Sequence, residues 1–379
     1  MKRSTAAEGD GLILIIVLST FIVIMSVLIF ILPRPRTSEK ENRVLAELPA
    51  LSLRSIADGS FTRGIADFYA DRVPFRDGLI SLRSNAELLA LRRETGGVIV
   101  ASEGYLVDRL EYGDGGYANI RANLDAIDRF ESVSGIETHV AVIPNAVNVL
   151  GRVLPPLYST ERADAVYSYL PKESRQLCRA SKDSSDRGEY VWYRTDHHFT
   201  SLGAYYTYRE LGRMLGYEPY PIDFFDTEDV SGSFLGTSYS SAGLPPMILD
   251  TVTLFRYEGD DNFTVTYGDT VMKGFYDMSR LDSKDKYAVF LGGNHALTSV
   301  RTDGADREKL VIVKDSFSHA LAPFLTLHFD LELVDLRYYS SSVLKLCREA
   351  GCQKVLVLCG VDTLAAATDM KRLEIGLYS

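Results

Sequence analysis

Four short apolar segments recur in the C-terminal part of the chain, at residues 288–292, 310–313, 331–335 and 354–358. Helical patterns fit between the later segments. Strand, helix and strand repeating at roughly 20–25 residues is typical of right-handed βαβ units, so we predict an α/β fold with a mostly parallel sheet. In open sheets of this kind, ligands bind outside the carboxyl ends of the strands. Polar residues directly after each segment are therefore the candidates for a functional site.

Upstream segments predict further helices and strands. The predicted helices are 61–93 with a break at Val73-Pro74, 117–133, 162–182, and 201–215 with Thr200 or Ser201 as its N-cap. A buried strand is predicted at 139–144, and residues about 220–285 predict a β-rich insertion because they are rich in Gly, Thr, Ser and Tyr. We expect a stalk and helical lead-in at 33–95, followed by one α/β domain at 96–379.

Residues 12–32 form a run of 21 residues without a charge. A helix of that length spans about 30 Å, the thickness of membrane hydrocarbon, and the run is longer than the apolar core of a cleaved signal peptide. We therefore predict a short tail at 1–11 and one transmembrane anchor at 12–32. Basic residues flank the run on both sides, so the positive-inside count does not decide its orientation. We expect a single-pass membrane protein whose C-terminal domain is extracytoplasmic. The placement of that domain rests partly on the family resemblance described below.

The formal net charge is −10, and the first 33 residues contribute nothing to it because their two basic and two acidic side chains cancel. Nucleic-acid-binding proteins usually carry a basic patch, so this balance argues against nucleic acid as a partner. Four cysteines are too few for a disulfide scaffold. A disulfide between Cys347 and Cys352, which flank Gly351, is left open by the sequence.

Ser316 follows the second apolar segment, where a strand is expected to turn into a helix. A hydroxyl exposed there would lie close to helix N-terminal amides, which are ready donors for a developing oxyanion. A single serine at a helix start is, however, more often an N-cap.

Asp196-His197-His198 precedes the helix predicted at 201–215. If the segment is extended, Asp196 and His198 face one side and His197 faces the other. A carboxylate beside an imidazole can hold its tautomer and stabilise the imidazolium during proton transfer. The three side chains could also be polar residues of a turn, or metal ligands, although a metal site would need at least one more ligand.

Five more candidates follow predicted strands. Gly293 and Asn294 follow the first apolar segment, where a glycine backbone and a side-chain amide suit an oxyanion hole. Arg337 and Tyr338 follow the third segment, and their guanidinium and aromatic groups suit a sugar surface. Asn145 holds the corresponding place after the strand predicted upstream. For each of these residues, a plain turn or sheet-edge role is an equally good interpretation.

The segment Thr195-Asp-His-His-Phe-Thr-Ser-Leu-Gly-Ala-Tyr205 resembles the signature of the DHHW family of membrane-anchored bacterial proteins. That family is similar to the SGNH-hydrolase-like domain of the alginate O-acetyltransferases. Supporting motifs follow in the expected order: Asp71–Asp77, Lys286–Asn294 and Lys314–Phe317. Two positions differ from the family pattern, since Phe199 replaces Trp and Lys314 replaces Gly.

The resemblance implies a three-layer α/β/α SGNH-hydrolase-like domain with a Ser-His-Asp triad. Asp196 would orient His198, which would act as general base for the nucleophile Ser316 in acyl transfer to water or to a sugar hydroxyl. We expect a membrane-anchored carbohydrate O-acetylesterase or O-acetyltransferase that acts on cell-surface polysaccharide, with no cofactor and no metal. A membrane-bound protein that passes on the acyl group would be a further partner.

Two alternatives use the same residues differently. The first is a non-catalytic glycan-binding or polysaccharide-assembly protein on an SGNH-like scaffold, suggested by the departures at Phe199 and Lys314. The second is a metal hydrolase. The deciding observation is distance: a triad requires a His198 ring nitrogen within about 4 Å of Ser316 Oγ, with Asp196 at the other nitrogen.

Overall fold

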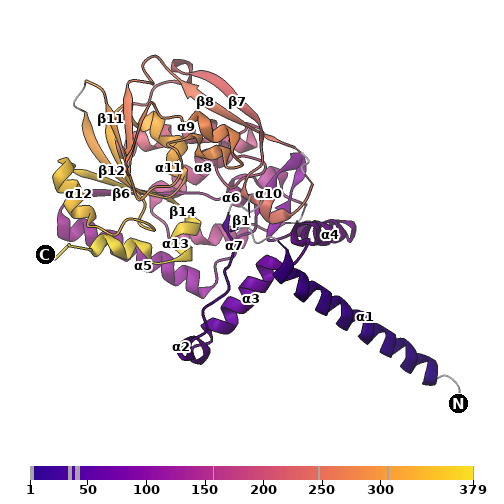
Figure 1. Ribbon diagram of the computed structural model, residues 1–379. Helices are drawn as coiled ribbons and strands as arrows, with labels where there is room; N and C mark the ends of the chain where they lie inside the picture. Colours follow the sequence, from indigo (N-terminus) through magenta and orange to yellow (C-terminus); the bar gives the residue numbers. More distant parts are fainter. Residues whose placement is uncertain are drawn as a thin grey trace. The chain divides into compact units, whose positions relative to one another are not determined.

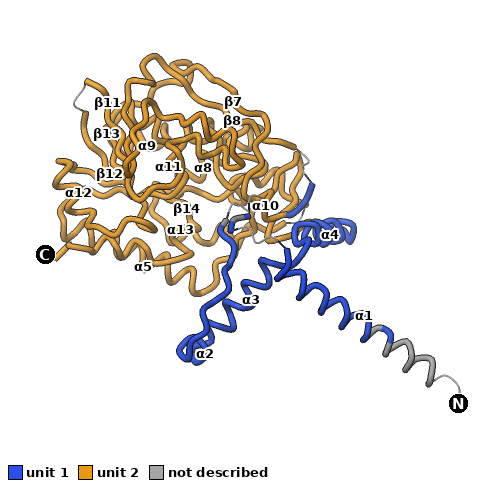
Figure 2. Tube along the Cα trace, viewed as in Figure 1, with its two compact units in different colours: residues 1–91, 243–245 blue, residues 92–242, 246–379 orange. Residues whose placement is uncertain are grey.

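The computed structural model describes residues 4–32, 36–38, 43–156, 158–245, 248–304 and 307–378. It divides into two compact units, Met1–Leu91 with Gly243–Pro245, and Arg92–Ala242 with Pro246–Ser379 (Figure 2). Figure 1 labels the helices and strands of both units.

The smaller unit is mainly helical. Its elements are α1 (Ser4–Ile31), β1 (Thr37–Ser38), β2 (Arg43–Val44), α2 (Leu53–Ala57), α3 (Ser60–Arg72) and α4 (Arg76–Leu89). The predicted break at Val73-Pro74 is confirmed, because the helix expected over 61–93 is two helices. Pro74 has no backbone N–H to continue α3, and Phe75 then adopts a left-handed φ of 60°.

The predicted transmembrane anchor is wrong. Among the residues that the structure describes, no helix combines the length and the apolar character needed to cross a membrane. The expected single-pass localisation is corrected with it. Residues 1–3 of the predicted tail and residues 33–35 and 39–42 of the predicted stalk lie outside the described residues.

The larger unit contains the remaining elements. Its α-helices are α5 (Asp114–Ser134), α6 (Ala146–Val149), α7 (Glu161–Asp164), α8 (Lys172–Asp186), α9 (Ser201–Leu215), α10 (Thr237–Ala242), α11 (Phe317–Leu325), α12 (Val343–Ala350) and α13 (Val361–Ala366). Its 3-10 helices are η1 (Ser102–Gly104), η2 (Gly151–Val153), η3 (Ala165–Ser168), η4 (Ile222–Phe224), η5 (Met278–Asp282), η6 (Lys286–Val289) and η7 (Asp369–Glu374). Its strands are β3 (Glu94–Thr95), β4 (Val98–Val100), β5 (Leu106–Asp108), β6 (Glu137–Ile143), β7 (Asp226–Phe234), β8 (Asp250–Arg256), β9 (Phe263–Tyr267), β10 (Thr270–Lys273), β11 (Leu297–Thr302), β12 (Glu308–Lys314), β13 (Phe329–Val334) and β14 (Lys354–Gly360).

A seven-stranded mixed sheet in the order β10-β9-β11-β13-β12-β14-β6 forms the centre of this unit. The half that runs from β13 through β12 and β14 to β6 is parallel, as predicted. The half that contains β11, β9 and β10 is antiparallel, so the sheet is mixed and not mostly parallel. The difference arises because β9 and β10, from the segment predicted as an insertion, pair with β11 and extend the same sheet. Short sheets β3-β4-β5 and β7-β8 complete the strands described in this unit.

Helices cover both faces of the sheet, which gives three layers (Figure 1). Alternate residues of β12 belong to different cores: Leu310 and Ile312 pack in the cluster that includes α9 and α11 residues, and Val311 and Val313 pack in the cluster that includes α5 and α12 residues. This follows from the period of two along a strand, which sends successive side chains to opposite faces. The predicted α/β class is therefore confirmed.

The apolar segment 288–292 is not a strand, contrary to our prediction. It contains the end of η6 and a turn, and only Phe290 forms an isolated bridge, with Tyr276. Leu291, Gly292 and Gly293 all have positive φ angles, which a strand does not accommodate. A short apolar run can be buried in a turn as well as in a strand, so its composition alone did not distinguish them.

Candidate active site

The Asp196–His198 segment is a series of bends held in place by one buried carboxylate. Asp250, at the start of β8, accepts hydrogen bonds from the backbone N–H groups of Arg194 (2.8 Å) and Thr195 (2.7 Å). It also accepts one from the Thr195 hydroxyl at 2.6 Å, and the Tyr190 hydroxyl donates to it as well. Four donors on one carboxylate give a loop with no regular secondary structure a single conformation.

Helix α9 starts directly after this loop. Thr200 is its N-cap, as predicted, and its side chain accepts a hydrogen bond from the N–H of Gly203 at 3.3 Å. Gly203 is required by the close approach of the preceding chain, because a Cβ there would lie 2.2 Å from the carbonyl oxygen of Val191. Phe199, which departs from the family pattern, is fully buried and packs on Trp192 and Phe317, so the aromatic at this position belongs to the core.

Ser316 lies between β12 and α11, at the carboxyl end of a central strand. The neighbouring Asp315 fixes this turn: its carboxylate accepts from the N–H of Phe317 (3.0 Å), the N–H of Gly360 (2.7 Å) and the hydroxyl of Thr363 (2.6 Å). Ser316 occupies the N-cap position, but its side chain makes no capping hydrogen bond. The hydroxyl is thus available for another partner.

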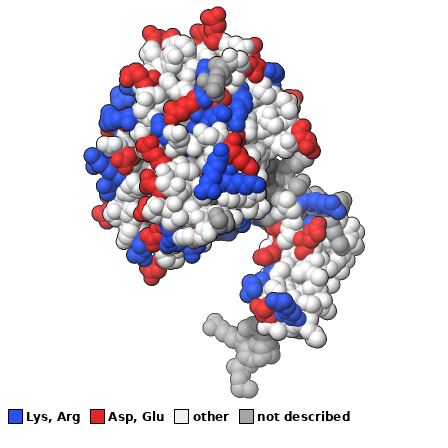
Figure 3. Space-filling view, turned by 90° about the vertical axis from the view of Figure 1, so that its left-hand side faces the viewer, with Lys and Arg blue, Asp and Glu red and all other residues white. Residues whose placement is uncertain are grey.

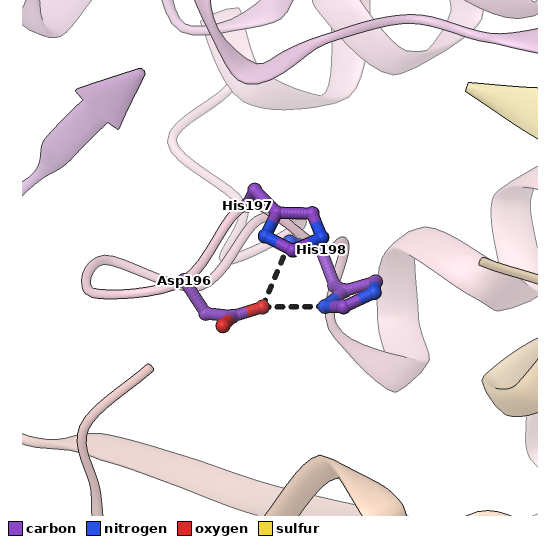
Figure 4. A group of neighbouring side chains, drawn as sticks. All are labelled: Asp196, His197 and His198. Atoms are coloured by element: carbon purple, nitrogen blue, oxygen red, sulfur yellow. Dashed lines mark hydrogen bonds and ion pairs between the residues drawn. The ribbon is translucent and has the colours of Figure 1, made fainter. Parts of the chain in front are cut away.

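That partner is His198. Its Nε2 lies 2.7 Å from Ser316 Oγ, and its Nδ1 lies 2.5 Å from Asp196 Oδ1. Figure 4 shows the Asp196 carboxylate directed at His198, whose backbone N–H also donates to Oδ1 at 3.0 Å. The structure therefore brings Asp196, His198 and Ser316 into one hydrogen-bonded series across 118 positions of sequence.

The electrostatics of this series favour an ionised Asp196. Both Asp196 and His198 are buried, with 3% and 6% of their surfaces exposed. Burial raises the pKa of Asp196, but the His198 and His197 imidazoles and the hydrogen bonds from His198 and Thr237 outweigh it, so the net pKa lies well below its usual range. Thr237 contributes its backbone N–H (2.8 Å) and its hydroxyl (3.1 Å) to Oδ2.

His197 does not face away from His198, as an extended segment would require. The two imidazole rings lie 4.0 Å apart at 34°, because the chain bends at these residues. His197 Nδ1 contacts the hydroxyl of Thr237 at 2.6 Å. Burial lowers the pKa of His197, and the neighbouring His198 lowers it further.

Asp196, His197 and His198 could each offer one ligand atom to a metal, all within 4.8 Å of one another. Both ring nitrogens of His198 already contact protein groups, Asp196 and Ser316. A metal bound by His198 would have to break one of these contacts. The arrangement thus suits proton transfer better than metal ligation.

Asn294, Arg337 and Tyr338 form one group on the surface. The Arg337 guanidinium donates to the carboxylate of Asp335 at 2.8 and 2.6 Å, and it lies 3.5 Å from Asn294 Oδ1. It also lies over the Tyr338 ring, 5.5 Å from its centroid, and 57% of the Tyr338 surface is exposed. Gly293 precedes this group in the turn after η6, with φ of 102°.

Asn145 has a different environment from the one predicted. It is the N-cap residue of α6, and its side-chain amide donates to the Tyr112 hydroxyl at 2.6 Å and to Asp362 at 3.3 Å. Both bonds engage the amide in a network with side chains that the sequence did not single out. A cavity of about 490 Å³ lies elsewhere, between β6, α8 and α9, and its lining residues include none of our predicted site residues.

Lys314 replaces the glycine of the family pattern without entering the Ser316–His198 contact. Its ammonium group is buried, 3.6 Å from the Asp335 carboxylate and 2.7 Å from His319 Nε2. Burial lowers the pKa of Lys314 to about 8, against the opposing effect of Asp335.

Sequence reasoning missed the residues that support the site. Asp315 directly precedes Ser316, and this adjacency is the sequence signal that could have identified it as a supporting residue. Thr237 is 41 positions from Asp196, and Asp250 is 55 positions from Thr195, so no spacing rule links them.

Comparison with known proteins agrees with this description. A family model described as DHHW protein matches residues 156–334, a range that contains Asp196, His198 and Ser316. The resemblance to the DHHW family is thereby confirmed. No curated protein matches the chain.

Two solved structures share its fold. A DHHW family protein from Eubacterium siraeum has a TM-score of 0.58 and 22% identity, covering 74% of this chain and 96% of that one. Bacillus cereus PatB1, in a structure with a sulfonyl adduct, has a TM-score of 0.58 and 17% identity, covering 73% and 97%.

Proposed function

We propose that this protein is a serine-dependent carbohydrate O-acetylesterase or O-acetyltransferase that acts on polysaccharide. The observation that carries the proposal is the unbroken series from Ser316 Oγ through His198 to Asp196, at 2.7 and 2.5 Å. The 2.7 Å between His198 Nε2 and Ser316 Oγ lies within the range at which a general base takes a proton from a nucleophile.

In the first half of the reaction, His198 Nε2 accepts the hydroxyl proton of Ser316 as Oγ forms a bond to the acyl carbonyl carbon. The ionised Asp196 stabilises the imidazolium that results and holds the proton on Nδ1. Within the described residues, the backbone N–H of Ser316 donates no hydrogen bond, so it is available to the oxyanion. The tetrahedral intermediate then breaks its bond to the donor oxygen, which takes the proton from His198, and an acyl-serine remains.

In the second half, His198 accepts a proton from water or from a sugar hydroxyl, whose oxygen attacks the acyl-serine carbonyl carbon. The tetrahedral intermediate that forms then breaks its bond to Ser316 Oγ, which takes the proton back from His198, so the free serine is restored. Water gives hydrolysis and a sugar hydroxyl gives transfer. The exposed Tyr338 ring and the Arg337 guanidinium beside it are groups that suit a polysaccharide chain. An acyl donor protein, expected from the resemblance, stays a prediction.

A sulfonyl fluoride provides the direct test. Bacillus cereus PatB1 is described with a sulfonyl adduct, and we expect phenylmethylsulfonyl fluoride to modify this chain at Ser316. Peptide mass spectrometry should place the added mass on Ser316, and hydrolysis of p-nitrophenyl acetate should stop as the label accumulates. Ser316→Ala should abolish both, whereas Ser132→Ala, at an exposed serine on α5, should retain both within about twofold. A labelled wild type whose label falls on another residue, or no labelling at all, would refute the proposal.

A second candidate function, glycan binding without catalysis, is favoured by the exposed Tyr338 at the surface group. In that case the protein would bind polysaccharide with an affinity that Ser316→Ala leaves unchanged and Tyr338→Ala weakens, and it would hydrolyse no acetyl ester. Binding and hydrolysis measured on the same protein samples separate the two functions.

A further inference from the structure

Tyr287 contacts the ring of His198 directly. It belongs to η6, far in sequence from the residues of the triad, and only 4% of its surface is exposed. Its ring stacks on the imidazole of His198, with centroids 3.9 Å apart and planes only 11° from parallel. Tyr287 lies in the Lys286–Asn294 motif, for which the family resemblance implies no role.

The same side chain also contacts the backbone of the nucleophile. The Tyr287 hydroxyl donates a hydrogen bond to the carbonyl oxygen of Ser316 at 3.1 Å. Burial raises the pKa of Tyr287 well above its usual value, so the phenol keeps its proton and stays a donor. One side chain therefore touches both partners of the Ser316–His198 contact.

The ring of Tyr287 is itself held by other aromatic residues. Tyr193 meets it edge-on at 6.3 Å and 88°, and Phe290 packs at 5.3 Å and 58°. Both neighbours are buried in the core of the larger unit. Tyr287 is thus a rigid surface against which the imidazole lies.

We infer that Tyr287 is a positioning residue of the proposed acyl-transfer site, and this inference rests on the proposed function. It acts in two ways. Its aromatic face favours His198 in the charged form that follows proton transfer, because a cation is attracted to the electron-rich face of a ring. Its hydroxyl holds the Ser316 turn, so that Oγ stays within hydrogen-bonding distance of Nε2 before substrate binds.

The test separates the ring from the hydroxyl. The rate constant for inactivation by phenylmethylsulfonyl fluoride is measured from pH 5 to pH 9 for the full chain, for Tyr287→Phe and for Tyr287→Leu. Tyr276→Phe is the matched control, because the hydroxyl of the half-buried Tyr276 also donates to a backbone carbonyl, that of Phe255 at 2.8 Å.

Each variant has a distinct expected profile. Tyr287→Leu removes the aromatic face, so the midpoint of the profile should move to lower pH by about 0.5–1 unit and the plateau should fall roughly 5–30-fold. Tyr287→Phe keeps the face and should retain the midpoint, with a plateau about fivefold lower. Tyr276→Phe should leave midpoint and plateau within about twofold of wild type.

If Tyr287→Leu folds and its midpoint is unchanged, the inference is overturned. Labelling of the wild type at Ser316 would in that case still support the proposed function. A wild type that is not labelled at Ser316 overturns both. If Tyr287→Leu does not fold, Tyr287→Met replaces it, since an unbranched side chain fills the space with less strain. The ring-proton resonances of His198 give a second readout: they should move downfield when the stacked ring is removed, and unchanged resonances would contradict the stacking role.

Discussion

At the scale of single residues, Asp196 has the most confined environment of the proposed triad. A Cβ at the neighbouring Gly236 would lie 2.2 Å from its carboxylate, so only glycine fits against it. His198 takes one carboxylate oxygen and Thr237 takes the other. Its pKa is lowered in spite of burial, which means that the folded protein holds the carboxylate ionised at neutral pH.

Replacing this charge should disable the base while leaving the fold in place. We expect Asp196→Asn to lower kcat/KM for an activated acetyl ester by roughly 10³–10⁴-fold, because the amide no longer stabilises the imidazolium or selects its tautomer. Asp303→Asn is the control, since that carboxylate pairs with Lys273 at the surface, and its activity should stay within about twofold. Activity of Asp196→Asn close to that of the wild type would exclude the role assigned to Asp196.

Lys314 offers a residue-scale prediction on stability. Its pKa of about 8 in the folded protein lies below the ordinary value of 10.5, so between these values the unfolded chain binds more protons. The stability therefore rises with pH in this window. From pH 8 to pH 9.5 the wild type should gain between about 1 and 2 kcal/mol relative to Lys314→Met, measured by urea unfolding. Equal pH dependence in the two proteins would show that Lys314 is not a buried, destabilised cation.

At the scale of elements, the loop before α9 depends on how closely the helix approaches the chain that precedes it. Gly203 permits that approach, because its Cα faces the Val191 carbonyl in the first turn of α9. The same turn carries the cap at Thr200, two residues after His198. A displacement of this helix start would therefore move the imidazole away from Ser316.

Two glycine variants test this coupling. Gly203→Ala should lower the free energy of unfolding by more than about 2 kcal/mol, because its Cβ meets backbone, and it should reduce esterase activity as well. Gly115→Ala, in the first turn of α5 with open space around it, should be neutral or stabilising by up to about 1 kcal/mol, with unchanged activity. The two thermal unfolding curves and the two kcat values settle the comparison, and a stable, active Gly203→Ala would contradict it.

At the scale of the whole molecule, the proposed site belongs entirely to the larger compact unit. Asp196, His198, Thr237, Tyr287 and Ser316 all lie within it. On the face shown in Figure 3, basic and acidic side chains are interspersed over this unit, although the chain as a whole carries a net charge of −10.

A fragment that begins at residue 92 tests whether this unit is self-sufficient. We expect residues 92–379 to unfold in one cooperative transition and to hydrolyse p-nitrophenyl acetate with a kcat within about fivefold of the full chain, because the hydrogen bonds of the site are internal to the unit. Circular dichroism during thermal unfolding and steady-state kinetics provide the measurements. Loss of cooperative unfolding in the fragment would show that residues 1–91 are needed for its stability.

Local sequence determined the elements whose patterns are strong and short in range. The parallel strands β6, β12, β13 and β14, the helix α9 with its cap, and the break at Pro74 all follow from apolar period, capping residues and proline chemistry. Ser316 could be proposed because polar side chains after parallel strands meet at one edge of the sheet. Asp196 and His198 could be proposed because a carboxylate lies beside an imidazole directly before α9, in a segment that resembles the family signature. By contrast, the apolar runs at 288–292 and 12–32 led to wrong assignments. Apolar composition indicates that a segment avoids water, but it does not say which other part of the structure the segment packs against.

Only the tertiary structure decided which atoms meet. The contact between Ser316 and His198 joins residues 118 positions apart, and the hydrogen bond from Thr237 to Asp196 joins residues 41 positions apart. Neither contact has a periodic signal in the sequence. The pairing of β9 with β11, which makes the sheet mixed, depends in the same way on distant backbone groups. Propensity and periodicity act over a few neighbouring residues, whereas these contacts depend on how whole layers pack, and packing is a property of the complete folded chain.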